Sequence, residues 1–149
     1  MTRITSIGIA VALSVLTPVV SFAQQDHSAS LTNSVYFELA KAPKKAAARR
    51  NPLETDPEAP AAGAKLFAQH CAECHGPAAE GGEKAPSLRA DEVQQAPPGA
   101  LFWILTNGVV RRGMPVWSKL PEPQRWAIVT YIKTLQDSPR PRVGDATAQ

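Results

Sequence analysis

The chain has 149 residues, 44% of them hydrophobic, and carries 16 lysines and arginines against 13 aspartates and glutamates. This length suffices for one small folded domain, and we do not expect two. Beyond the basic pI, nothing in the composition supports nucleic-acid binding.

Residues 1–23 have the pattern of a secretory signal peptide. One positive charge precedes an apolar run over residues 7–20, and small residues occupy the two positions that a signal peptidase reads. We therefore predict cleavage after Ala23 and a periplasmic mature protein without a stable membrane span. An uncleaved anchor is the alternative, because the run approaches spanning length, although Pro18 weakens it.

Two flanking arms are expected on either side of one domain at residues 57–137. Residues 24–56 are predicted to form a low-complexity basic and proline-rich extension, and residues 138–149 a flexible tail. The domain holds eight acidic and eight basic side chains, so the positive excess lies in the arms. That excess is either a patch that steers an acidic partner or, as we predict, the charge of a solvated, disordered segment. The apolar cluster around Tyr36 and Phe37 could pack on the core, meet a partner subunit or form a transient turn.

The stretch Cys71-Ala72-Glu73-Cys74-His75 is the most informative in the chain. Two cysteines separated by two residues and followed directly by histidine are typical of a c-type haem attachment site. In a helix the two thiols lie one turn apart, so both can reach the vinyl groups of one porphyrin. His75 then lies beneath the iron as its proximal ligand. We predict one covalently attached haem c.

Three other interpretations of this motif are weaker. A thioredoxin-like redox pair needs a βαβ setting, and no alternating β-branched runs flank the cysteines. A tetrahedral zinc site needs four protein ligands, and the chain offers two cysteines and three histidines. A disulfide across so small a loop would stabilise the fold least. Export agrees with haem, because thiols that have become thioethers can no longer be oxidised.

The segment before the motif has the periodicity of a helix. It is expected to begin near Pro57, with Asp56 as its N-cap. Gly63, Phe67 and Cys71 recur every fourth residue, which places them on one face, expected to point towards the haem.

Two further helices are predicted after the motif. Residues 100–107 form a short middle helix ended by Gly108, and its leucines and isoleucine (Leu101, Ile104, Leu105) are expected to face the porphyrin. Trp103 is either a core residue or a donor to a haem propionate. The last helix spans about residues 121–136, with Trp126 off the centre of its apolar stripe, which comprises Ile128, Tyr131, Ile132 and Leu135.

Over residues 57–136 the chain resembles the class I c-type cytochromes. In that family a glycine and an aromatic residue precede the first haem cysteine at the spacing of Gly63 and Phe67, on an N-terminal helix that crosses a C-terminal one. Ile128 and Tyr131 match the pair that packs on them. The resemblance implies an all-α, cytochrome c-like domain wrapped around one haem.

Met114 is the only methionine besides the initiator. Iron held by one histidine needs a second protein ligand to stay low-spin and closed, and a thioether is the soft, neutral choice that raises the reduction potential. A lone methionine ordinarily fills a core. Here Gly113 and Pro115 flank it, as in the family's distal loop, so we predict Met114 as the sixth ligand. His27 in the arm and His70 on the proximal side are poorer alternatives.

Three more residues have an expected place near the haem. In the resembling family, a proline at about the distance of Pro86 has its carbonyl accept the ring N–H of the proximal histidine. A plain turn is the alternative for this proline. Arg111 and Arg112 either neutralise the haem propionates or lie in solvent.

The predicted function is single-electron transfer, without enzymatic activity. The chain shows no acid–base pair, nucleophile relay or phosphate-binding loop. By resemblance, a periplasmic dehydrogenase or quinol-oxidising complex would be the donor and a terminal oxidase or similar acceptor would complete the respiratory chain, with the protein monomeric or dehydrogenase-associated. The alternatives are a tightly bound dehydrogenase subunit and a gas sensor or peroxidase, which would need an open iron site.

Overall fold

The computed structural model describes residues 36–136; the predicted signal peptide, His27 and the C-terminal tail lie outside them. The described elements are helical: η1 (Phe37–Lys41), α2 (Lys44–Ala47), α3 (Ala59–His70), α4 (Ala72–His75), α5 (Asp91–Gln95), α6 (Pro98–Asn107), η2 (Val110–Arg112) and α7 (Glu122–Thr134). This confirms the predicted all-α class for this part of the chain. Within it, no helix is long and apolar enough to span a bilayer.

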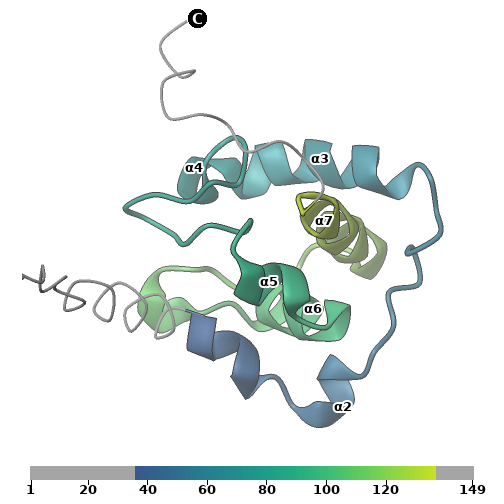
Figure 1. The fold of residues 1–149 in the computed structure, drawn as a ribbon, viewed down its shortest axis with the longest axis horizontal. Helices are drawn as coiled ribbons and strands as arrows, with labels where there is room; N and C mark the ends of the chain where they lie inside the picture. Colours follow the sequence, from purple (N-terminus) through teal and green to yellow (C-terminus); the bar gives the residue numbers. More distant parts are fainter. Residues whose placement is uncertain (1–35, 137–149) are drawn as a thin grey trace, which may run out of the picture.

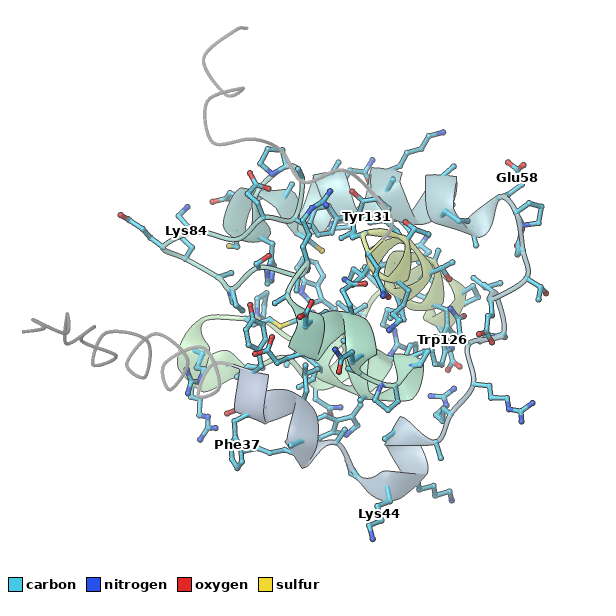
Figure 2. The ribbon with its side chains drawn as sticks, in the orientation of Figure 1. Phe37, Lys44, Glu58, Lys84, Trp126 and Tyr131 are labelled. Atoms are coloured by element: carbon cyan, nitrogen blue, oxygen red, sulfur yellow. The ribbon has the colours of Figure 1, made fainter. Side chains whose placement is uncertain are left out.

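Helix α3 crosses α7 (Figure 1), and the two backbones come close together at Gly63. A Cβ on Gly63 would lie 2.0 Å from the carbonyl oxygen of Ala127 and 2.8 Å from Cβ of Tyr131, so only glycine lets the two backbones meet. The rings of Phe67 and Tyr131 pack beside this contact with centroids 5.3 Å apart. Figure 2 shows Tyr131 between the two helices. The predicted crossing is confirmed, but Gly63 and Phe67 face α7 and not the haem cavity.

The buried surface of α7 is wider than the predicted stripe. Trp126 and Val129 are as buried as Ile128. The Trp126 ring stacks on Phe102 of α6 with centroids 4.0 Å apart. Trp126 is therefore central to the core, because α7 packs against α6 as well as α3, and a helix between two neighbours buries two faces.

Helix boundaries follow the prolines and glycines. Helix α3 begins at Ala59, two residues later than predicted, because Pro60 lacks an N–H and is accommodated in a first turn. Asp56 caps the preceding turn, where its Oδ1 accepts the N–H of Glu58 at 2.9 Å. Gly108 ends α6 as predicted, with φ +65° and its N–H on the carbonyl of Ile104 at 2.7 Å. Helix α5 was not predicted.

Residues 36–56 are ordered on the core, which corrects the prediction of a solvated extension for this part of the arm. The buried Asn51 donates from Nδ2 to Oγ1 of Thr130 on α7 at 2.8 Å. Helix α2 lies against α6, where a Cβ on Gly99 would come within 2.3 Å of the Ala46 carbonyl oxygen (Figure 1). The lysine- and alanine-rich composition gives no sign of these contacts in the sequence, because each contact depends on one residue and not on a periodic pattern.

Candidate haem site

A cavity of about 380 Å³ opens between α4 and the segment that follows α6. The predicted haem residues Cys71, Cys74, His75 and Met114 all line it. Helices α5, α6 and α7 contribute an aliphatic part of its wall: Val93, Leu101, Ile104, Leu105, Ile128, Val129 and Ile132. The predicted orientation of the middle helix towards the porphyrin agrees with this wall. Such an apolar cavity suits a large planar cofactor.

The cysteine motif forms a single helical turn. The N–H of Cys74 and the N–H of His75 both bond to the carbonyl of Cys71, at 3.1 and 2.9 Å, and Gly76 ends the turn with φ +82°. No disulfide joins the two cysteines, and Cys71 is half-buried while Cys74 is exposed. Burial and the neighbouring Cys74 raise the pKa of the Cys71 thiol to about 11. Because Cys71 and Cys74 lie in this turn, their sulfurs are one turn apart, and both residues line the cavity, as thioether attachment requires.

His75 is oriented by one hydrogen bond, from its Nδ1 to the carbonyl oxygen of Pro86 at 2.9 Å. A carbonyl only accepts, so the proton is on Nδ1 and Nε2 presents its lone pair. Burial lowers the pKa of His75, and the Pro86 bond opposes that shift only partly. The imidazole is thus neutral and able to bind a metal, and Pro86 has the contact expected of it.

Met114 is held on a short loop that folds back on α6. The N–H of Val109 donates to the carbonyl of Met114 at 3.0 Å, and the reverse bond measures 3.3 Å. Gly108 makes the turn possible, because a Cβ there would lie 2.5 Å from the carbonyl oxygen of Pro115. The loop places a half-buried thioether at the cavity that His75 also lines.

The family described as cytochrome c oxidase, cbb3-type, subunit III matches residues 58–132, half of the chain. The protein belongs to this family of c-type cytochromes. The solved structure of cytochrome CL from the marine methylotrophic bacterium Methylophaga aminisulfidivorans MPT is similar, with 28% sequence identity and a TM-score of 0.50. The match covers 57% of this chain and 58% of that one, so the chain spans little more than half of that relative. No curated protein matches.

Covalently bound haem c is therefore the cofactor of this cytochrome domain, and electron transfer is the activity of such domains. The cavity fits this cofactor by its donor set: two thiols one turn apart, an imidazole with Nε2 free and a thioether.

Other predicted residues of the cytochrome differ in their relation to the cavity. His70 lines it, but its ring packs against that of Trp117, with centroids 5.2 Å apart. Trp103 does not line it, which removes the support for Trp103 as a propionate donor, and Trp117 does. Arg112 lines the cavity, whereas Arg111 pairs with Glu38 at its edge.

Sequence reasoning missed three lining residues from the arm, Tyr36, Glu38 and Leu39. The apolar cluster around Tyr36 was the available signal, and packing on the core was one of its open interpretations. Phe37 points out of η1 into solvent (Figure 2) and is 60% exposed. The cluster is thus divided between the cavity wall and the surface.

Proposed function

We propose that this protein is a periplasmic monohaem cytochrome that carries single electrons between redox partners, with His75 and Met114 as the axial ligands. The observation that carries the proposal is the presence of both side chains at one cavity, with Nδ1 of His75 already bonded to Pro86. The signal-like residues 1–23 support export, and the match over residues 58–132 supports a domain at residues 57–137.

Each residue has a defined task in this proposal. Cys71 and Cys74 hold the porphyrin through thioethers, so the cofactor stays in register with His75. The haem iron supplies the one-electron redox couple. With haem bound, His75 and Met114 would hold its iron in both oxidation states, which would keep small molecules out and reorganisation small. The Pro86 carbonyl fixes the imidazole ring and raises its basicity.

Replacement of Met114 tests the ligand assignment. The ferric wild-type protein should show the weak long-wavelength absorption band of sulfur-bound iron, and Met114→Leu should lose it. The reduction potential should fall by roughly 0.1 V, within the range of about 0.8 V that axial ligands span. His70→Gln removes the rival ligand and should keep the band. Retention of the band in Met114→Leu would contradict the assignment, and intact mass after denaturation should include one haem.

A second candidate is a cytochrome subunit that stays bound to a periplasmic dehydrogenase. Large apolar side chains near the cavity favour a protein contact there: Phe37 is 60%, Val110 69% and Val116 49% exposed. Gel filtration of the native extract separates the candidates. Co-migration of the haem with a large subunit supports the bound form, and elution at the size of the isolated chain supports the shuttle.

A further inference from the structure

Residues 36–41, here called the strap, form part of the haem cavity although they precede the family match at residues 58–132. Tyr36, Glu38 and Leu39 line the cavity, and Leu39 also packs against the aliphatic core. The strap packs against α6 and, through Glu38, contacts η2 in the segment that follows α6. It is therefore a wall element that the cytochrome domain itself does not supply.

The first end of the strap contacts the loop that orients His75. The Tyr36 hydroxyl donates to the carbonyl of Ser87 at 2.9 Å. Ser87 directly follows Pro86, whose own carbonyl accepts the His75 Nδ1 proton. Burial raises the pKa of Tyr36, so the phenol keeps the proton that it donates. Tyr36 thereby restrains the peptide adjacent to the one that fixes the imidazole.

The other contact reaches the loop that carries Met114. The Glu38 carboxylate pairs with Arg111 and lies 3.9 Å from Nε of Arg112, both in η2. The Val109–Met114 bridge closes the loop around η2, so a displacement of η2 moves Met114 as well. The Glu38 side chain is only 13% exposed, which makes this pair stronger than a fully solvated one.

We propose that Tyr36 and Glu38 are positioning residues that tie the His75 loop to the Met114 loop along one wall of the haem cavity. The strap holds the loop that orients His75 and the loop that carries Met114 at a fixed distance from each other. It thereby governs how readily Met114 would leave the iron. This inference rests on the proposed function, because it presupposes Met114 as the sixth ligand.

Imidazole binding to the ferric holoprotein measures the release of Met114, because imidazole takes the position that Met114 vacates. Glu38→Gln should bind imidazole about 3- to 10-fold more tightly than the wild type, since the loop opens at lower cost. Tyr36→Phe should change the affinity in the same direction by about 2-fold or more. Glu38→Gln combined with Arg111→Gln should add little to Glu38→Gln alone, because both remove one ion pair.

Glu122→Gln is the matched control. Glu122 makes the equivalent contact at the other end of the arm, with Arg49 at 2.5 Å, but does not line the cavity. Its imidazole affinity should equal that of the wild type, even where the loss of stability in urea equals that of Glu38→Gln. A merely structural role for Glu38 would instead change the imidazole affinity of both variants in proportion to their loss of stability.

The outcomes separate the two proposals. Wild-type affinity in Glu38→Gln, with sulfur-bound iron in the wild type, overturns the strap and leaves the electron carrier intact. A wild type without sulfur-bound iron overturns the ligand assignment and the strap with it. Should Glu38→Gln fail to yield holoprotein, Arg111→Gln removes one of the Glu38 ion pairs at a side chain that is 63% exposed. Its imidazole affinity should rise by about 2-fold or more, less than in Glu38→Gln, because Arg112 still lies 3.9 Å from Glu38.

Discussion

His75 shows how one backbone carbonyl prepares a metal ligand. The bond from Nδ1 to Pro86 selects the tautomer, and burial favours the neutral ring. Both effects come from the polypeptide, so the fold itself selects the tautomer that leaves Nε2 for the metal. Gly63 is a second single residue with a large effect, because its lack of a Cβ lets α3 approach α7 closely.

Gly63→Ala should destabilise the holoprotein by about 1–3 kcal/mol, although alanine favours helices by about 1 kcal/mol over glycine. The new Cβ would lie 2.0 Å from the Ala127 carbonyl oxygen, and a backbone atom inside a helix cannot move aside cheaply. Urea unfolding followed by circular dichroism measures the difference. Gly82→Ala is the control, because nothing lies within 4 Å of its Cβ position, and it should differ from wild type by less than about 0.5 kcal/mol. Equal stability of Gly63→Ala and wild type would contradict the close crossing.

At the scale of elements, polar contacts hold the arm to the cytochrome domain along its described length. Tyr36 bonds to Ser87 and Glu38 to η2. Asn51 bonds to Thr130 of α7, and Arg49 bonds to Glu122 of the same helix. Arg49 also lies over the Phe102 ring, 4.7 Å from its centroid. These contacts explain why residues 36–56, which include few large apolar side chains, pack against the domain.

Acidification should loosen the strap before it unfolds the domain. Hydrogen bonds from Lys41 and Arg111 hold the pKa of Glu38 below its ordinary value of 4.5. A carboxylate with a depressed pKa contributes stability above its unfolded value, and the contribution is lost as pH falls through the folded pKa. Hydrogen exchange of residues 36–41 in the holoprotein, corrected for intrinsic rates, should therefore show protection that declines below pH 4.5.

Glu38→Gln supplies the comparison for that experiment. Its strap should be less protected at neutral pH and should lose no further protection through the titration of residue 38. A decline of the same size in Glu38→Gln and wild type would assign the acid effect to other groups.

At the scale of the whole molecule, the core and the haem cavity share their residues. Val93, Leu101, Leu105, Ile128 and Ile132 belong to the buried cluster and also line the cavity. Without haem these apolar side chains would face water or the walls would have to collapse onto one another, and either change costs stability. The net stability of a small domain is only about 5–15 kcal/mol, so this loss is large for it.

The haem-free chain should therefore be largely unfolded. A Cys71→Ser, Cys74→Ser double variant, shown by its absorption spectrum to contain no haem, should have lost most of its far-ultraviolet helical signal. Circular dichroism compares it with the holoprotein at equal concentration. Full native helix in the haem-free variant would mean that the polypeptide core suffices by itself.

The sequence by itself determined the cofactor and the all-α class. Cys71, Cys74 and His75 lie within one helical turn, so their spacing in the sequence is enough to predict how they lie relative to one another. Gly63 and Phe67 precede Cys71 at the same helical spacing. Only the tertiary structure decided the place of the arm, the central burial of Trp126, and Trp117 in place of Trp103 at the cavity. The Tyr36, Arg49 and Asn51 contacts join residues 51, 73 and 79 positions apart, and single contacts at such separations leave no periodic trace in a sequence.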